Sequence, residues 1–245
     1  MKSFLAAIAF LTRFPVPGAA TFGPADVAYS AGWFPLIGLL VGMIYSLAAA
    51  LLKSHLPPAA VAVLLLMLDS LATGALHFDG LADTADGFGG GQSSEDILRI
   101  MRDHAIGTYG GLALVLLVAF KVAAYASLLH RGDWIPALIL TPALGRWSIL
   151  LLTASLPYAR PSASVVEGMG KRSLYWGTGV IFVALIAAMS GRAWIATGAV
   201  VAVTTAFGFY CRRRIAGVTG DTLGANLQLC ESAALLTFLW TGYPQ

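Results

Sequence analysis

Charged residues are scarce in this chain of 245 residues: Asp, Glu, Lys and Arg together make up 11% of it, against 58% hydrophobic residues. A water-soluble domain carries about 25% charged residues, so the composition excludes an ordinary soluble domain. The mean hydropathy of +0.79 is instead typical of a chain that crosses a lipid bilayer several times. The sequence therefore predicts an all-α, polytopic integral membrane protein.

Cysteine is also rare. Cys211 and Cys230 are the only two, and their spacing indicates neither a metal site nor a disulfide. The sequence shows no low-complexity tract, obvious repeat or linker, so residues 1–245 are expected to form one transmembrane domain. Arg13 interrupts the first apolar run, which favours a short helix along the membrane surface over a cleaved secretory signal. A lipid bilayer is the expected environment, no nucleic-acid partner is expected, and an oligomer is compatible with the sequence.

About seven stretches are long and apolar enough to cross a bilayer, which takes about 20 residues. The expected spans are 32–52, 57–77, 107–129, 134–155, 173–190, 193–210 and 222–241. Basic residues gather in cytoplasmic loops. With a cytoplasmic N-terminus, only Lys53, Arg131 and Arg192 fall outside, whereas ten other Lys and Arg residues fall inside. We therefore expect the N-terminus on the cytoplasmic side of the membrane.

Acidic residues gather in the segment 77–87, HFDGLADTADG. On a helix, Asp79, Asp83 and Asp86 lie at positions i, i+4 and i+7 and so share one face. Like charges on one face repel, and folding alone does not require that arrangement. Mg²⁺ prefers oxygen ligands and is usually held by one or two carboxylates plus substrate phosphates. The segment predicts a magnesium–diphosphate site at the cytoplasmic surface, with a solvated acidic loop as the alternative.

Two more segments carry candidate site residues. Arg102, Asp103 and His104 precede the third span; Arg102 is expected to pair with a phosphate, and Asp103 to add a metal ligand or orient a base. A charged helix end is the alternative. Asp221 opens the last span and is either a catalytic carboxylate or a helix N-cap. The further substrate-binding candidates in this region are Gly220, Thr222, Asn226 and Glu231.

Ionisable residues also occur inside the expected spans. Asp69, Arg146 and Glu231 each lie about eight to ten residues, or roughly 12–15 Å, from the cytoplasmic boundary. Their equal depth predicts an ion-paired cluster, which either forms the floor of a cytoplasmic cavity or fixes the packing of the helices. Lys121 lies deeper.

Together these segments resemble the cobalamin synthase family of adenosylcobinamide-GDP ribazoletransferases. The resemblance rests on HFDGLADTADG, on MRDHAIGTYGG at 101–111 and on GDTLGAN followed by a Glu, and it extends to FLTRFPVP at 10–17 and GWFPLIGLLVG at 32–42. One departure is His104-Ala105, where the family pattern has a basic residue near position 105.

The resemblance implies a magnesium-dependent membrane enzyme that joins adenosylcobinamide-GDP to α-ribazole, or to its 5′-phosphate, and releases GMP. By likeness, Asp79, Asp83 and Asp86 match the family's acidic motif, and Asp221 matches the aspartate of its GDTLGA motif. The three acidic-motif residues would hold one or two magnesium ions bridging the diphosphate. Either Asp86 or Asp221 would accept the proton of the ribazole hydroxyl, and Arg102 with the 212–214 run would attract the anionic groups.

Two other functions stay open. CDP-alcohol phosphotransferases use a similar aspartate-rich motif, but their pattern continues with an arginine and a second acidic pair that this chain lacks. A transporter would account for the ionisable residues inside the spans. The polar residues nevertheless gather at one membrane face, whereas transporters usually place them near the midplane between related halves.

Overall fold

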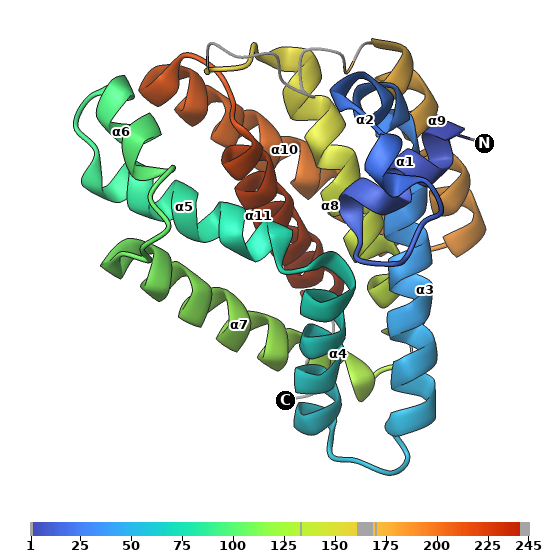
Figure 1. Cartoon of the computed structure of the whole chain (residues 1–245). Helices are drawn as coiled ribbons and strands as arrows, with labels where there is room; N and C mark the ends of the chain where they lie inside the picture. Colours follow the sequence, from blue (N-terminus) through green and yellow to red (C-terminus); the bar gives the residue numbers. More distant parts are fainter. Residues whose placement is uncertain (1, 133, 161–168, 170, 241–245) are drawn as a thin grey trace.

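The computed structural model describes residues 2–132, 134–160, 169 and 171–240, and these are mostly helical (Figure 1). The elements in chain order are α1 Lys2–Leu11, η1 Ala19–Thr21, α2 Pro24–Ser30, η2 Ala31–Trp33, α3 Phe34–Leu52, α4 Pro58–Thr73, α5 Leu76–Gly90, α6 Ser94–Ile100, α7 Thr108–Leu129, α8 Trp134–Ser155, α9 Lys171–Ala188, α10 Gly191–Ile215 and α11 Gly220–Leu239. Within these ranges the only β pairing is an isolated bridge between Tyr158 and Val218. The all-α prediction is confirmed.

Four helical segments among the described residues are long and apolar enough to cross a membrane: the continuous run 24–52, α7, α8 and α10. The pair α4 and α5 meets the same criterion only as one bent span, which would make five. α11 does not meet it, because Asp221, Asn226, Gln228 and Glu231 lower its hydropathy. The membrane class of the protein is confirmed, whereas the count of seven spans and the side of the N-terminus stay predictions.

The chain turns by 91° between α4 and α5. Gly74 and Ala75 both adopt the left-handed conformation, with φ of 65° and 57°, and such a residue ends a helix. Gly74 is also required by space, because a Cβ there would collide with the side chain of Arg13. The predicted span 57–77 therefore ends at Thr73, and α5 crosses the molecule instead of continuing α4 (Figure 1).

α8 lies at the centre of the molecule and is buried along most of its length. α3 packs closely against it, because a Cβ added at Gly38 would lie 2.5 Å from the Cα of Ala143, and one at Gly42 would lie 2.6 Å from the Cα of Ile139. Small residues spaced four apart let membrane helices approach in this way.

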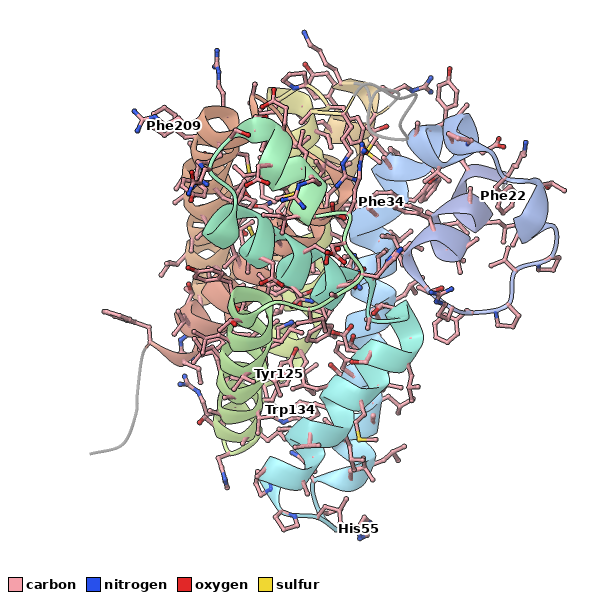
Figure 2. The ribbon with its side chains drawn as sticks, turned by 60° about the vertical axis from the view of Figure 1, so that its left-hand side comes forward. Phe22, Phe34, His55, Tyr125, Trp134 and Phe209 are labelled. Carbon is pink, nitrogen blue, oxygen red and sulfur yellow. The ribbon has the colours of Figure 1, made fainter. Side chains whose placement is uncertain are left out.

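α11 is the second central helix and contacts α5, α7, α8 and α10. Tyr125 of α7 and Trp134 of α8 fill the interior, whereas His55 and Phe209 lie at opposite ends of the molecule (Figure 2). Any side chain on the inner face of α11 is thus surrounded by helices that come from distant parts of the sequence.

Candidate active site

The acidic motif forms one stripe of α5, as its spacing predicted, but its three aspartates are not equally exposed. Asp79 is exposed, Asp83 is half-buried and Asp86 is buried. Because α5 packs on α11 and α7, the stripe passes from the surface into the contact with α7. The three carboxylates therefore meet different surroundings.

Asp86 holds the first turn of α7. Its carboxylate accepts hydrogen bonds from the backbone N–H groups of Gly107, at 2.7 Å, and Gly110, at 2.8 Å. The first N–H groups of a helix have no partner within it, so Asp86 caps α7 from a different helix. A Cβ at either glycine would collide with this carboxylate. Both oxygens of Asp86 are therefore engaged, and its roles as metal ligand and base stay predictions.

Asp221 reaches the acidic motif where α11 crosses α5. A Cβ added at Gly80 would lie 2.8 Å from the carbonyl oxygen of Asp221 and 3.3 Å from the Cα of Gly224, so both glycines permit the close crossing. Gly80 directly follows Asp79 in α5 and lies within the turn of helix that ends at Asp83. The crossing therefore brings a fourth carboxylate beside the stripe.

The N-terminus of α11 is capped by Thr219 and Thr222. The N–H of Thr222 donates to Oγ1 of Thr219 at 3.2 Å, and the N–H of Thr219 donates to Oγ1 of Thr222 at 2.8 Å. The alternative that Asp221 is the N-cap is therefore wrong. Its side chain is directed instead to the site.

Arg160 is a site residue that the sequence did not reveal. Its Nη2 lies 2.7 Å from Oδ2 of Asp221. Backbone hydrogen bonds hold the preceding residues in place: the N–H of Ala159 donates to the carbonyl of Val218 at 2.8 Å, and the N–H of Val218 donates to that of Pro157 at 2.9 Å. The only signal in the sequence was the place of Arg160 in a loop expected to be cytoplasmic.

Negative charge exceeds positive charge around these groups. Burial and the neighbouring charges of Asp79, Asp221 and Asp86 raise the pKa of Asp83 to about 6. Burial likewise raises the pKa of Asp221, while Arg160 opposes that shift. Four carboxylates and one guanidinium leave an excess of negative charge, which is the electrostatic setting that a divalent cation stabilises.

The geometry is that of an open site. Among the described residues, no group of three or more His, Cys, Asp or Glu side chains comes together closely enough to hold a metal ion. Mg²⁺ keeps several waters and usually takes one or two carboxylates together with phosphates. The exposed Asp79 and half-buried Asp83 fit that donor set better than a closed cage of three carboxylates.

The predicted residues before α7 stay at the surface. Arg102, Asp103 and His104 are all exposed, and Asp103 accepts a hydrogen bond from the N–H of Ala105 at 3.1 Å. Within the described ranges no hydrogen bond or ion pair joins them to the aspartates. Their substrate contacts stay predictions.

The predicted residues of α11 are mostly interior. Gly220 is exposed at the start of the helix, whereas Thr222 is buried in the cap. Asn226 is buried and donates to the Ser148 hydroxyl at 3.0 Å and to the Thr204 hydroxyl at 3.4 Å. Glu231 is also buried. The structure thus brings Asp221 to the acidic motif. Thr222, Asn226 and Glu231 instead bind other groups inside the protein.

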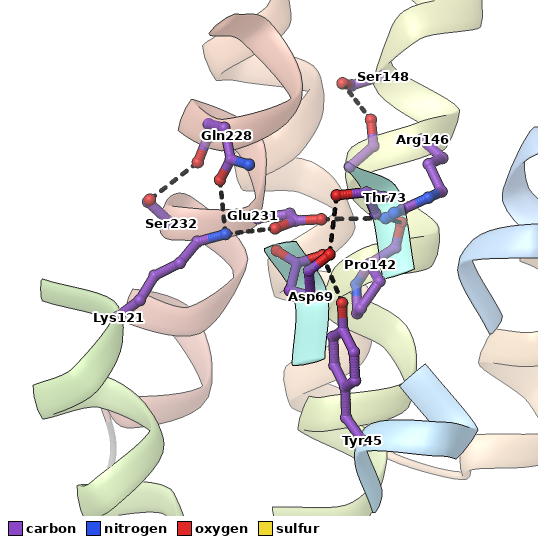
Figure 3. Close-up of polar contacts among 11 residues, drawn as sticks. Tyr45, Asp69, Thr73, Lys121, Pro142, Arg146, Ser148, Gln228, Glu231 and Ser232 are labelled. Atoms are coloured by element: carbon purple, nitrogen blue, oxygen red, sulfur yellow. Dashed lines mark hydrogen bonds and ion pairs between the residues drawn. The ribbon is translucent and has the colours of Figure 1, made fainter. Parts of the chain in front are cut away.

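Glu231 belongs to a buried ion-pair network (Figure 3). Its Oε2 lies 2.6 Å from Nζ of Lys121, and its Oε1 lies 3.3 Å from Nη1 of Arg146. Lys121 also donates to Gln228 at 2.6 Å. Ion pairing of Arg146 with Glu231 is confirmed, whereas Asp69 accepts a hydrogen bond from the Tyr45 hydroxyl. Lys121, which the sequence left unplaced, supplies the second cation.

The basic run 212–214 was expected to attract anionic substrate groups. Arg214 instead donates to the carbonyl oxygens of Phe88, at 3.0 Å, and Gly91, at 2.9 Å. These carbonyls lie at the C-terminal end of α5, where the last C=O groups of a helix need partners. Arg214 therefore ties α10 to α5, whereas Arg212 and Arg213 are exposed.

The sequence profile of the cobalamin-5-phosphate synthase family matches residues 3–239. The chain belongs to this family. Membership of the cobalamin-5-phosphate synthases confirms the resemblance that the acidic motif and GDTLGAN indicated. The match covers both helices of the α5–α11 crossing and Arg160.

Curated relatives carry one name. A protein of Ectopseudomonas mendocina is 40% identical over 242 residues, covering 94% of this chain and 95% of its own length. One of Rhizobium etli is 38% identical over 241 residues, covering 94% and 93%. One of Syntrophobacter fumaroxidans is 37% identical over 234 residues, covering 93% and 94%. All three are named adenosylcobinamide-GDP ribazoletransferase. No solved structure matches the chain.

Proposed function

We propose that this protein is a magnesium-dependent adenosylcobinamide-GDP ribazoletransferase that accepts α-ribazole or α-ribazole 5′-phosphate and releases GMP. The family and the names of the relatives support the reaction class. The observation that carries the proposal is the crossing at Gly80 and Gly224, which gathers carboxylates from α5 and α11 beside Arg160. A folding role alone does not require this excess of negative charge at a surface.

Asp79 and Asp83 are the residues that would hold magnesium. The ion supplies charge neutralisation on the phosphoryl oxygens, which is the main requirement of phosphoryl transfer. Asp79 is exposed and Asp83 half-buried, so both leave room for waters and a diphosphate. Asp86 supports this pair indirectly, because its bonds to Gly107 and Gly110 fix α7 against α5.

Asp221 and Arg160 act on the reacting groups. In the transfer, an oxygen of the ribazole forms a bond to the phosphorus next to the cobinamide, and the bond from that phosphorus to the bridging oxygen of GMP breaks. Asp221 accepts the proton that the ribazole hydroxyl loses. Arg160, which already contacts Asp221, donates hydrogen bonds to the anionic phosphate oxygens.

The protein is proposed to lie in a bacterial inner membrane with this site facing the cytoplasm. The excess of basic residues in loops expected to be cytoplasmic supports that orientation. Cysteine labelling in intact cells tests it. The exposed Gln92, just after the end of α5, should be labelled as Gln92→Cys only after the membrane is opened. His55→Cys, in the exposed loop between α3 and α4 at the end of the molecule away from Phe209 (Figure 2), should be labelled from outside. Cys211 and Cys230 are both buried. The reverse pattern would contradict the orientation.

Release of GMP by the purified protein in detergent tests the reaction. GMP should appear only when adenosylcobinamide-GDP, a ribazole substrate and Mg²⁺ are all present, and a transporter without a sealed compartment should release none. Asp221→Asn and Arg160→Gln should slow the release, whereas the matched control Asp96→Asn, whose carboxylate pairs only locally with Arg99, should not. Release at the normal rate by Asp221→Asn would refute its role.

A further inference from the structure

A groove of about 860 Å³ runs between α3, α8 and α9. These helices lie on the other side of the molecule from α5 and α6 (Figure 1). Apolar side chains such as Met43, Ile139 and Val183 line it. The small residues Gly179 and Ala184 also line it and leave space within the groove. Val183 is 67% exposed, so no described helix covers the groove.

A second pocket of about 810 Å³ adjoins the groove at the start of α9 and shares Tyr175 and Trp176 with it. Its lining is mixed: aromatic rings are joined there by the polar side chains of Ser3, Ser173 and Arg172. Arg172 is exposed and makes no ion pair with any of the described residues. An apolar groove thus leads to a guanidinium that has no ion-pair partner in the part of the chain that the structure describes.

Aromatic side chains surround the junction of the two spaces. The ring of Trp33 meets that of Trp176 edge-on, with 5.4 Å between centroids, and meets Phe4 at the same distance. A Cβ added at Gly32 would lie 3.0 Å from Trp176, so this glycine lets α9 approach. Trp and Tyr gather at the boundary between lipid and water. The junction is therefore expected at that boundary.

The dimensions fit one lipid tail. Along α9 the groove extends from Tyr175 to Ala188, which is about 20 Å at the rise of an α-helix. The hydrocarbon core of a bilayer is about 30 Å thick, so a groove that starts at the boundary spans one leaflet and accommodates an acyl chain. Apolar contact alone would not engage Arg172, whereas a lipid with an anionic headgroup would do so.

We propose that this groove binds an anionic glycerophospholipid, with one acyl chain between α3, α8 and α9 and the phosphate group at Arg172. Anionic headgroups attract basic side chains at the membrane surface, and charge-assisted contacts to phosphate are strong. The bound lipid completes the packing of α9 on α8. Gly177 already lets Leu150 of α8 contact α9 directly, and the acyl chain fills the space beside that contact.

Native mass spectrometry of the full-length protein in detergent, after removal of endogenous lipid, tests the proposal. We expect phosphatidylglycerol to bind about fivefold more tightly than phosphatidylcholine with the same acyl chains, because one basic residue near the surface contributes that much. Arg172→Gln should remove the preference. Lys171→Gln, a neighbouring charge that does not line either space, should keep it.

A second variant tests the groove itself. Gly179→Leu places a side chain in the groove, and its Cβ meets nothing within 4 Å. Binding of both lipids should fall about tenfold, as expected from the loss of apolar contact. The matched control is Gly198→Leu on α10, where an added Cβ also meets nothing within 4 Å. Circular dichroism and gel filtration would confirm that both variants fold.

Three results would overturn the proposal. One is equal affinity of the unmodified protein for the two lipids, and another is a headgroup preference that survives Arg172→Gln. The third is unchanged lipid binding by Gly179→Leu. If Gly179→Leu instead converts a dimer to a monomer, the occupant of the groove is a second copy and not a lipid.

Discussion

The protein holds two groups of charged side chains, and they are built in opposite ways. In the interior, Glu231 is ion-paired with Lys121 and Arg146, and all three are at most 4% exposed. At the crossing of α5 and α11, carboxylates outnumber the single guanidinium of Arg160, and Asp79 faces solvent. Each charged side chain of the first group has an ion-pair partner within the protein, whereas the carboxylates of the second group exceed its one guanidinium.

The difference separates structural charge from functional charge. A buried charge without a partner is costly, and in the interior network Lys121 and Arg146 are both paired with Glu231. The aspartates remain near the surface, where water reduces the cost of their repulsion. Excess charge that is kept accessible is available to a metal ion and a diphosphate.

Glu231→Gln should lower the free energy of unfolding by about 3–5 kcal/mol, because Lys121 and Arg146 would lose their common counter-ion in the interior. Denaturant unfolding in detergent measures the change. The matched control is Ser232→Ala on the same helix, which removes one hydrogen bond to the Gln228 carbonyl and should cost about 1 kcal/mol. Equal stability of Glu231→Gln and the unmodified protein would show that the network is not structural.

Asp83→Asn should have the opposite signature: a loss of transferase rate of about 100-fold or more with no loss of stability. The pKa of Asp83 is raised in the folded protein, so its charged form disfavours folding and a neutral amide relieves repulsion. GMP release and thermal unfolding without metal measure the two effects. Parallel losses of rate and stability would place Asp83 with the structural charges.

Asp86→Asn should reduce stability less than Glu231→Gln does, but more than Asp83→Asn does. An amide has one carbonyl oxygen to accept from Gly107 and Gly110, so the α7 cap is weakened by about 1–2 kcal/mol. The Mg²⁺ concentration for half-maximal rate should not change. A strong increase in that concentration would make Asp86 a metal ligand. Gly110→Ala should reproduce the stability loss, because its Cβ would collide with the same carboxylate.

Ser93→Ala should have the smallest effect. The hydroxyl of Ser93 accepts a hydrogen bond from the N–H of Asp96 at 3.1 Å and caps α6. Its removal should cost about 1 kcal/mol and leave the transferase rate unchanged, because Ser93 belongs to neither charged group. A reduced rate, measured by GMP release, would extend the site to α6.

Local spacing predicted part of the site correctly. The i, i+4, i+7 pattern placed Asp79, Asp83 and Asp86 on one stripe of a helix, because helical periodicity depends only on neighbouring residues. It did not predict that Asp86 would be buried against Gly107 and Gly110, since burial depends on the helix that packs there. The same limit applies to Asp221, which the sequence left as either a cap or a site residue.

Hydropathy predicted the membrane class but not the path of the chain. The apolar stretch 57–77 was interpreted as one span, yet the chain turns at Gly74 and Ala75. Gly in a membrane helix is common, and at Gly74 the side chain of Arg13, which lies far away in the sequence, occupies the space that a Cβ would need. No local rule distinguishes a glycine that continues a helix from one that ends it against a distant residue.

Composition, periodicity and motif are properties of the chain, and they were enough to predict the all-α membrane class, the acidic stripe and the family. Which charges share a site depends on tertiary contacts. Close contacts at Gly80 and Gly224 bring Asp221 beside the acidic stripe. Backbone hydrogen bonds between residues 157–159 and Val218 place Arg160 next to Asp221. These contacts join residues far apart in the chain, and their distances are set by the packing of whole helices.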